Sequence, residues 1–175
     1  MLTQFGPELA PGWYFLDSTH VKVHADGSNP AADQAPKAMG RTKGGLNTKI
    51  HAVVNARSQA IVIALSSGNE ADLSLAEELT ECLPKDSTLI ADKGYDSSIL
   101  RQTATAKGVQ TCIPGRTNRT TTVPFSAKLY RRRHRVENFF QSIKRYRRVA
   151  TRYDKLGGTF LGFVCLAILL TLRLT

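Results

Sequence analysis

The first third of the chain carries apolar patterns typical of strands. Trp13 to Leu16 is an apolar run that ends in Asp17-Ser18-Thr19, and Val21 to His24 alternates with the period of a half-buried strand. Lys49 to Val54 and Ala60 to Leu65 are two β-branched runs separated by a short polar segment, which is typical of a hairpin. Together these runs predict three early antiparallel strands.

From Glu70 onward the apolar period becomes that of helices. The first helix begins near Glu70, has one apolar face and ends before Pro84. The run Thr88 to Ala91 does not alternate, which indicates a strand buried on both faces, as in the parallel part of a sheet. A helix from Ser98 to Lys107 and a strand from Val109 to Ile113 follow.

Two more helices complete the pattern, one from about Ser126 to Ala150 and one from about Thr159 to Leu172. The predicted order is therefore three strands, helix, strand, helix, strand, helix, helix, which is the order of a ribonuclease-H-like domain. We expect an α/β fold with a mixed five-stranded sheet flanked by helices. With 175 residues, of which 42% are hydrophobic and 22% charged, the chain suits a single globular domain that spans residues 1–175.

The C-terminal run raises the question of a membrane. Thr159 to Leu172 is uncharged and fourteen residues long, so as a helix it would span about 21 Å against the roughly 30 Å of a bilayer core. A buried helix is the favoured interpretation. The N-terminus lacks the features of a secretory signal, and the three cysteines are too dispersed to form a metal pair or a disulfide framework, which fits a reducing cytosol.

Net charge points to a polyanionic partner, with nucleic acid ahead of an anionic membrane. The chain carries 24 basic and 14 acidic side chains, a formal charge of +10. Eleven of these bases and only two of the acids lie between Lys128 and Lys155, so this segment holds +9 of the excess. Glu137 is the only acid within the run 131–137. A carboxylate among so many cations stays ionised at neutral pH, as a metal ligand must.

Three acids stand out as candidates for chemistry. Asp17 ends the first apolar run and Asp92 ends the fourth strand, and ligands of open α/β sheets bind at the carboxyl ends of strands. On a helix that advances about 100° per residue, Arg133, Glu137 and Lys144 project within about 60° of Tyr130, while the neighbouring stripe is apolar. Without the two aspartates, a salt-bridged amphipathic helix would be the favoured interpretation.

These residues resemble the DDE-type insertion-sequence transposases marked by a Tyr-x2-Arg-x3-Glu-x6-Lys signature. Tyr130, Arg133, Glu137 and Lys144 match that spacing without a gap. Further blocks resemble the family in order: Leu16-Asp17-Ser18-Thr19, Lys43-Gly44-Gly45-Leu46-Asn47-Thr48-Lys49, Ala91-Asp92-Lys93-Gly94-Tyr95-Asp96 and Arg133-His134-Arg135-Val136-Glu137-Asn138-Phe139-Phe140. The resemblance implies that Asp17, Asp92 and Glu137 are the catalytic metal-binding triad. It also implies that Tyr130, Arg133 and Lys144 contact phosphates near the scissile bond.

The implied activity is metal-dependent DNA cleavage at transposon ends and strand transfer into target DNA, that is, DNA transposition and recombination by an endonuclease. Carboxylates are the ligands that Mg²⁺ prefers, with Mn²⁺ as an alternative, and two ions are expected for in-line displacement on phosphorus.

The expected partners are terminal inverted repeats, target DNA and a second copy of the chain during reaction. Only sixteen residues precede Asp17, so we expect the DNA-end-binding region to be absent or supplied by an upstream reading frame. A bacterial cytoplasmic, nucleoid-associated protein is expected.

Basic residues outside the signature are expected to bind the DNA backbone, which gives affinity and salt dependence without sequence specificity. In the polar loop from Asp26 to Gly45, Lys43 is a candidate for backbone contact. His20 and His24 are four apart in a strand and are not favoured as metal ligands, and His24 is the better candidate for a supporting role next to the metal site. The full set of candidate DNA-binding residues is Lys43, Lys49, Lys93, Arg131, Arg132, Arg135, Arg145, Arg147 and Arg148.

Two rival hypotheses come from other classes of protein. A non-catalytic DNA-binding transposon remnant would bind DNA through the basic helix without cutting it. A membrane-surface protein would be anchored by the C-terminal helix, whose segment from Phe160 to Leu172 would then not pack against the sheet. The complete set of three acids favours the transposase.

Overall fold

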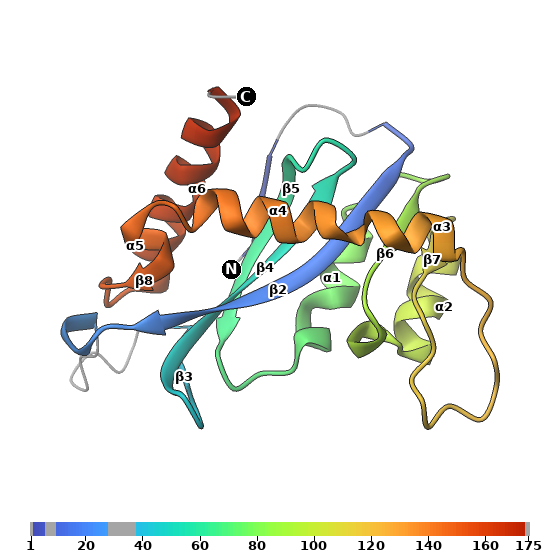
Figure 1. The fold of residues 1–175 in the computed structure, drawn as a ribbon, viewed down its shortest axis with the longest axis horizontal. Coiled ribbons are helices and arrows are strands. Elements are labelled where there is room, and N and C mark those ends of the chain that lie inside the picture. Colours follow the sequence, from blue (N-terminus) through green and yellow to red (C-terminus); the bar gives the residue numbers. More distant parts are fainter. Residues whose placement is uncertain (1, 6–9, 28–37, 174–175) are drawn as a thin grey trace.

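An eight-stranded mixed sheet forms the centre of the computed structural model, which describes residues 2–5, 10–27 and 38–173. The strands follow the order β1-β5-β4-β2-β6-β7, while β3 pairs with β4 and β8 with β2 (Figure 1). Pairing is antiparallel from β1 to β2 and parallel from β2 to β7. The strands are β1 Leu2–Gln4, β2 Trp13–Val23, β3 Gly40–Thr42, β4 Gly45–Asn55, β5 Ala60–Ser67, β6 Thr88–Ile90, β7 Gln110–Cys112 and β8 Thr151–Arg152.

Strand β2 joins the first two apolar runs into one strand of 11 residues. It pairs antiparallel with β4 over its middle and parallel with β6 over Trp13–Phe15. The prediction that Asp17 lies at the carboxyl end of a strand is therefore wrong, because β2 continues for six residues beyond it. The pairing with β4 provides ladder partners for Asp17, Ser18 and Thr19, so these polar residues do not end the strand.

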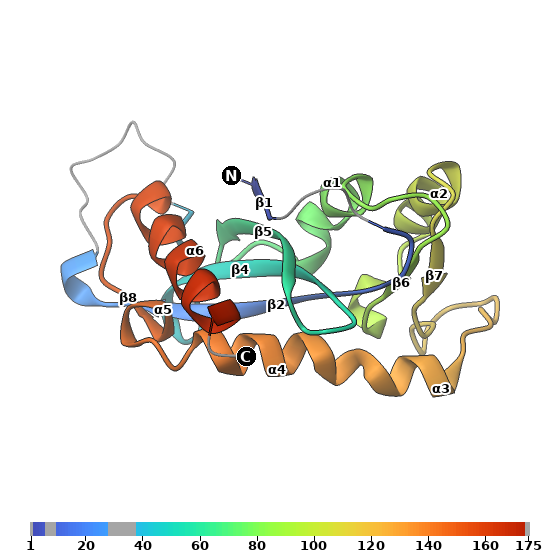
Figure 2. The ribbon, with the colours of Figure 1, turned by 90° about the horizontal axis from the view of Figure 1, so that it is seen from above.

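The sheet separates two hydrophobic cores, each covered by helices (Figure 2). Helices α4 and α6 pack on one face, where Phe15, Ile50 and Ile63 are fully buried. Helices α1 and α2 pack on the other face, where Leu16 and Val62 are fully buried. The α-helices are α1 Ala76–Glu81, α2 Ser98–Ala106, α3 Ala127–Tyr130, α4 His134–Ile143, α5 Arg147–Ala150 and α6 Gly157–Arg173; short 3₁₀-helices cover Ala25–Gly27, Asp72–Leu75, Lys93–Tyr95 and Arg131–Arg133.

The long basic helix is shorter than expected. Helix α3, the 3₁₀-turn at Arg131–Arg133 and α4 follow one another along one face of the sheet (Figures 1 and 2). The chain leaves the helix after Ile143 and resumes as α5. This break turns the chain so that Val149 enters the core and β8 lies beside the end of β2. The single helix predicted to continue to Ala150 is thus wrong at its C-terminal end.

The predicted count of five strands is also too low. The additional strands β1, β3 and β8 contain only two or three residues each. Such short strands carry no period long enough to recognise, and they form because a neighbouring strand offers free backbone groups. Strand β3 lies inside the segment that we expected to be a loop, of which residues 28–37 fall outside the described residues.

Helix α6 buries only one of its faces, which corrects the expectation of a buried helix. Phe160, Val164 and Ile168 are at most 1% exposed, whereas Leu166 and Leu169 are at least half exposed. Its packing against the α4 core contradicts the membrane-anchor hypothesis, which requires this segment to be free of the sheet. Among the described residues, no helix is long and apolar enough to cross a membrane.

Candidate active site

Asp17 and Asp92 occupy matching positions beside the junction of β2 and β6. The parallel ladder pairs Phe15 with Ile90, and each aspartate stands two residues further along its own segment. At Asp92 the chain leaves the sheet and enters a 3₁₀-turn, where the Asp92 carboxylate accepts a hydrogen bond from Gly94 N–H at 2.7 Å. This brings together two acids that are 75 residues apart in sequence.

Asp17 is half-buried, and its surroundings act on its protonation in opposite directions. Burial raises the pKa of Asp17 above its ordinary value, and the neighbouring negative charge of Asp92 raises it further. The Ser18 N–H, which donates to Asp17 Oδ1 at 2.8 Å, and the Arg133 guanidinium both act against this rise. A cation bound at this carboxylate would therefore favour its ionised form.

Arg133 links Asp17 to Glu137. The Arg133 Nη1 atom donates to Asp17 Oδ2 at 2.8 Å, and its Nη2 atom donates to Glu137 Oε1. Arg133 and Glu137 are one helical turn apart, so the helix presents both side chains to the strand that carries Asp17. The structure thus brings Asp17 and Glu137 to opposite ends of one guanidinium.

Lys144 also reaches β2, whereas Tyr130 lies at the far end of the same helical stripe. Lys144 Nζ donates to Thr19 Oγ1 at 2.6 Å and to the His20 carbonyl at 3.0 Å, and burial lowers the pKa of Lys144. Tyr130 is half-buried, with its ring edge-to-face against Phe125 at a centroid distance of 5.6 Å. The neighbouring stripe, which includes Val136, Phe139 and Ile143, is buried in the core as predicted.

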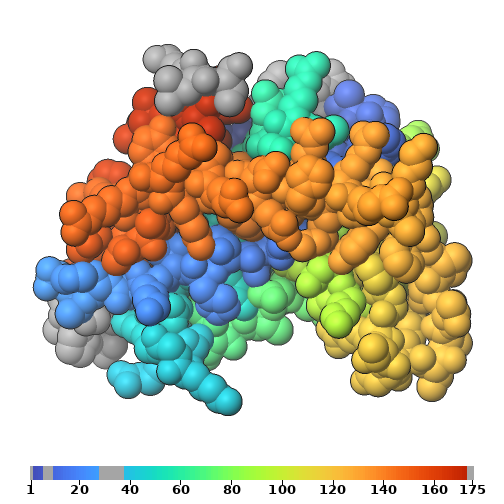
Figure 3. Space-filling model, viewed as in Figure 1, coloured from blue at the N-terminus to red at the C-terminus, as the bar shows by residue number. Residues whose placement is uncertain are grey.

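An open cleft of about 530 Å³ runs between β2 and α4. Figure 3 shows the α3–α4 segment crossing this face of the molecule beside β2. Both acids held by Arg133 lie on the cleft, together with Lys144. Its lining residues are Asp17, Ser18, Thr19, Glu137, Phe140, Gln141, Lys144 and Arg145.

A polar network lies on the opposite face of β2 and includes Lys49. Ser18 Oγ donates to Asp72 Oδ1 at 2.5 Å, and Lys49 Nζ lies 2.8 Å from the same oxygen. Lys49 is buried and also donates to the Glu70 carbonyl. The expectation that Lys49 contacts the DNA backbone is therefore not supported, because its ammonium is enclosed and paired within the protein.

A second network, not anticipated from the sequence, fixes the turn after Asp92. The Asp96 side chain is 1% exposed and accepts from Arg101, Arg119 and the backbone N–H of Arg116. Burial opposes ionisation of Asp96, but these hydrogen bonds outweigh it and lower its pKa to about 2. Arg116 in turn donates to the carbonyls of Lys93 and Gly94. Asp96 directly follows the Asp92 turn, yet its partners lie up to 23 residues later, so no local pattern could identify them.

The candidate DNA-binding arginines of the basic segment are mostly exposed. Arg132 stacks over the Trp13 ring at 4.6 Å, and Arg148 lies 4.0 Å over the Phe163 ring while it pairs with Asp154. Arg135 is half-buried. Five exposed arginines extend along the segment on either side of Glu137: Arg131, Arg132, Arg145, Arg147 and Arg148.

The other two candidate lysines outside the helix lie in different places. Lys93 is exposed in the turn next to Asp92. Lys43 is exposed between β3 and β4, in a hairpin that projects from the sheet away from α4 (Figure 1). Lys93 is thus next to the candidate site, while Lys43 would have to meet a different stretch of DNA.

The histidines do not join the acids. His24 pairs with Asp26 at 3.2 Å and its ring packs on Tyr153 at 4.7 Å. It lies seven residues beyond Asp17 along the chain, a separation of about 23 Å at 3.3 Å per residue. The idea that His24 supports a metal site at Asp17 is therefore wrong. His20 is exposed on β2.

The oxygen donors of the site suit a hard divalent cation. Asp17 and Glu137 already accept one cationic group between them, the Arg133 guanidinium, which stands where positive charge is required. Carboxylate oxygens are the ligands that Mg²⁺ and Mn²⁺ prefer. In their present positions, no three His, Cys, Asp or Glu side chains among the described residues are grouped closely enough to hold a metal ion.

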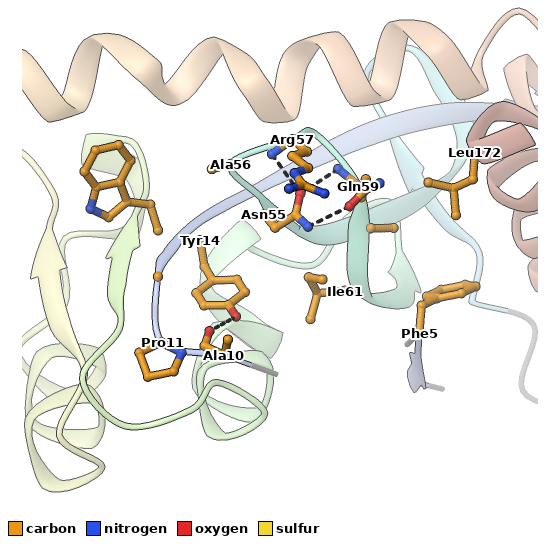
Figure 4. A pocket seen from close by; sticks show the side chains of 13 residues that line it. Phe5, Ala10, Pro11, Tyr14, Asn55, Ala56, Arg57, Gln59, Ile61 and Leu172 are labelled. Atoms are coloured by element: carbon orange, nitrogen blue, oxygen red, sulfur yellow. Dashed lines mark hydrogen bonds between the residues drawn. The ribbon is translucent and has the colours of Figure 1, made fainter. Parts of the chain in front are cut away.

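A larger hollow of about 590 Å³ lies elsewhere, between the start of β2, the β4–β5 turn and the end of α6 (Figure 4). The Tyr14 hydroxyl donates to the Ala10 carbonyl at 2.6 Å within it. Arg57 is the one charged side chain among its lining residues in the part of the chain that is described. None of the candidate site residues lines this hollow, so the smaller cleft beside α4 is the better candidate site.

Comparison with known proteins identifies relatives over most of the chain. A family model described as "Transposase DDE domain" matches residues 11–172. A Brucella ovis protein named as a transposase for insertion sequence element IS6501 is 36% identical over 123 residues, which cover 70% of this chain and 95% of the relative. The residues that match the family model include the central strands, α4 and the three candidate acids.

Proposed function

Because the chain belongs to the family of transposase DDE domains, we propose that it catalyses metal-dependent phosphodiester cleavage at transposon ends and strand transfer into target DNA. The acids that we propose as catalytic are Asp17, Asp92 and Glu137. The observation that carries this proposal is the link between Asp17 and Glu137 through Arg133, beside the junction of β2 and β6 where Asp92 stands.

We also propose that the chain forms one catalytic domain with a ribonuclease-H-like core. The five longer or central strands support this: β5, β4 and β2 are antiparallel, β2, β6 and β7 are parallel, and the order is β5-β4-β2-β6-β7. Helices on both faces enclose this core. In such a sheet Asp17 on β2 and Asp92 after β6 lie on adjacent parallel segments. Glu137 is contributed by helix α4, which covers the sheet.

The oxygen atoms of Asp17, Asp92 and Glu137 would hold Mg²⁺ or Mn²⁺. A bound divalent cation supplies positive charge that activates water and stabilises the leaving oxygen of a phosphodiester. Three carboxylates drawn together around one site would repel one another, and a bound cation would offset that repulsion. The chemistry of the donor set therefore agrees with the family's requirement for a divalent metal.

The other residues of the signature are proposed to bind the DNA backbone at the cleft. Arg133 has a planar fork of donors that suits bidentate recognition of a phosphate, and Lys144 acts as a point charge. Lys144 bonds Thr19, two residues after Asp17 on β2, and lines the same cleft as Asp17 and Glu137. The half-buried Tyr130 offers a hydroxyl at the other end of the same stripe.

The exposed arginines of the basic segment are proposed to extend this contact along the duplex. Arg131 and Arg132 lie before Glu137, and Arg145, Arg147 and Arg148 follow it. Each phosphate neutralised by such a residue releases counterions, so the affinity for DNA falls steeply with salt concentration. Removing the charges of Arg145 and Arg147 together should weaken binding and make the slope of log affinity against log salt shallower by about 2, at roughly 0.9 per phosphate contact.

A cleavage assay tests the proposal directly. The substrate is a plasmid that carries the nucleotide sequences flanking the gene, incubated with the full chain and Mg²⁺ or Mn²⁺. We expect nicking at the element boundaries that requires metal and is lost in Asp17→Asn, Asp92→Asn and Glu137→Gln, while the exposed Glu81→Gln retains it. Metal-dependent cleavage that survives Glu137→Gln would falsify the assignment of this acid.

The rival function is a transposon remnant that binds DNA without cutting it. It predicts that wild type and the three acid variants bind the plasmid with equal affinity and that none of them cleaves it.

Cleavage at two ends would involve two copies of the chain, and a region encoded upstream would supply recognition of the terminal repeats. A boundary-specific product formed by the chain alone would argue against the need for that upstream region.

A further inference from the structure

The geometry points to a second role for Arg133: we infer that its guanidinium competes with the divalent cation for the carboxylates of Asp17 and Glu137. This inference rests on the proposed function and adds a property of the same site. A bound metal and the guanidinium would not be held together by the same oxygen atoms. A cation that binds through the two oxygen atoms that Arg133 contacts therefore requires release of the guanidinium.

The competition follows from the specific atoms that Arg133 contacts. One amino group of the guanidinium bonds Asp17 Oδ2 and the other bonds Glu137 Oε1. Asp17 Oδ1 accepts the Ser18 N–H in addition. A cation that takes Asp17 Oδ2 and Glu137 Oε1 as ligands must displace Arg133 from both at once.

The surroundings of Arg133 allow this release. Its side chain and that of Asp17 are each 21% exposed, and Glu137 is 47% exposed, so the guanidinium can turn toward the cleft without crossing the core. The cleft beside it is lined by Lys144 and Arg145. A released guanidinium would therefore face the same space as the cations proposed to hold DNA phosphates.

Two consequences distinguish competition from a plain salt bridge. First, Arg133 lowers the affinity of the site for metal, because part of the binding energy goes into breaking its two charge-assisted hydrogen bonds. Second, metal binding frees the Arg133 guanidinium to bind a DNA phosphate through two hydrogen bonds. Bound metal should therefore raise the affinity for DNA, and bound DNA should raise the affinity for metal. Binding coupling of this kind is reciprocal.

The first test measures Mn²⁺ binding to the full chain by calorimetry without DNA. Arg133→Gln is compared with Arg131→Gln, which removes the same charge from an exposed position two residues earlier on the same helical segment. We expect Arg133→Gln to bind Mn²⁺ roughly tenfold more tightly than wild type, and Arg131→Gln to stay within about twofold of wild type because its charge is exposed and screened. Equal affinity in Arg133→Gln and wild type, including no binding by either, overturns the inference.

A second measurement titrates the wild-type protein, in which Arg133, Asp17 and Glu137 are all unchanged. The side-chain ¹⁵N resonance of Arg133, assigned by its absence in Arg133→Lys, is followed in wild type as Mg²⁺ is added. We expect it to move toward the position and faster solvent exchange of a guanidinium without a carboxylate partner. If Mg²⁺ leaves this resonance unchanged while it shifts backbone resonances at Asp17, the guanidinium is not displaced.

Failure of this inference and failure of the proposed function give different results. Cleavage that requires metal and Glu137 supports the catalytic assignment whatever Arg133→Gln does to metal affinity. Tighter Mn²⁺ binding by Arg133→Gln without any cleavage by wild type supports the competition but not the catalytic assignment.

Discussion

Lys49 Nζ lies 2.8 Å from Asp72 Oδ1, and the two partners differ sharply in burial: the Lys49 side chain is 5% exposed and the Asp72 side chain 47%. The ammonium cannot return to water when its partner is lost, whereas the carboxylate can. Ser18, which follows Asp17 on β2, donates to the same Asp72 oxygen. This pair therefore supports, from the far side of the sheet, the strand that carries a proposed catalytic acid.

Removing either partner should have unequal effects on stability. Asp72→Ala leaves a buried ammonium that, among the described residues, keeps the Glu70 carbonyl as its acceptor, so we expect the free energy of unfolding to fall by about 2–3 kcal/mol. Lys49→Met removes the buried charge and leaves Asp72 hydrated, so a loss of about 1 kcal/mol or less is expected. Urea denaturation of both variants measures this difference. A larger loss in Lys49→Met than in Asp72→Ala would contradict the view that burial of the ammonium dominates.

The fully buried His51 should make stability depend on pH in the weakly acidic range. Burial, reinforced by the Lys49 charge, lowers the pKa of His51 from 6.5 to about 4. Between these values the unfolded chain binds a proton that the folded chain excludes, so stability is fully present above pH 6.5 and falls as the pH is lowered toward 4. The loss at pH 4 is about 3 kcal/mol, because each tenfold change in proton affinity between the folded and unfolded chains corresponds to about 1.4 kcal/mol.

Urea denaturation at several pH values between 7 and 4 measures this dependence. His51→Asn removes the titrating group and should flatten the profile over this range, whatever its effect at pH 7. The difference between wild type and variant isolates His51 from the carboxylates that titrate nearby. A variant profile parallel to that of wild type would rule out a buried neutral His51.

Asp96 should stabilise the fold above about pH 4. Its pKa is lowered to about 2 by its arginine partners and the Arg116 N–H, against the opposing effect of burial. The contribution is thus present above the unfolded pKa of about 3.9 and is lost as the pH falls toward 2. We expect Asp96→Asn to lower the free energy of unfolding by about 2 kcal/mol at pH 7.

The matched control is Asp86→Asn, at an exposed turn position whose backbone φ of 60° an asparagine tolerates. It should change stability by less than about 0.5 kcal/mol. The gap between wild type and Asp96→Asn should narrow between pH 4 and pH 2. A gap that stays constant would mean that Asp96 acts through its shape and not through its charge.

The sequence was most informative where a site is built on a regular element. Tyr130, Arg133, Glu137 and Lys144 share one stripe because helical geometry is local, and the apolar stripe beside it is buried as the period predicts. The mixed α/β fold class could be predicted for the same reason, because the periods of helices and strands are local features of the sequence. Local periodicity failed at Asp17, where three polar residues resemble the end of a strand but are paired with β4 and continue it.

Contacts between distant residues could not be predicted from local pattern. Lys49 lies in a strand whose alternation looks ordinary, and only the fold brings Asp72, 23 residues later, against its ammonium. The same holds for Arg133 and Asp17, which are 116 residues apart in sequence. The spacing of the signature indicated that these residues are functional. It did not predict that Arg133 bonds both Asp17 and Glu137.

Gly94 offers a test of how closely the Asp92 carboxylate must be positioned. A Cβ atom at Gly94 would lie 2.8 Å from Asp92 Oδ1, closer than van der Waals contact allows. The atom it meets is the end of a side chain and not backbone, so Gly94→Ala should move the carboxylate while it leaves the turn intact. We expect the rate of DNA cleavage to fall roughly 10- to 100-fold, as misplacement of a reacting group by about 1 Å can cause.

The loss should appear in kcat and not in the affinity for DNA, because the exposed arginines that we propose to bind DNA are untouched. The free energy of unfolding should change by less than about 1 kcal/mol, since the side chain can rotate away. Gly162→Ala in α6 is the matched control, because nothing lies within 4 Å of a Cβ atom there. It should keep the wild-type rate. Full activity in Gly94→Ala would show that Asp92 either tolerates displacement or does not take part in the reaction.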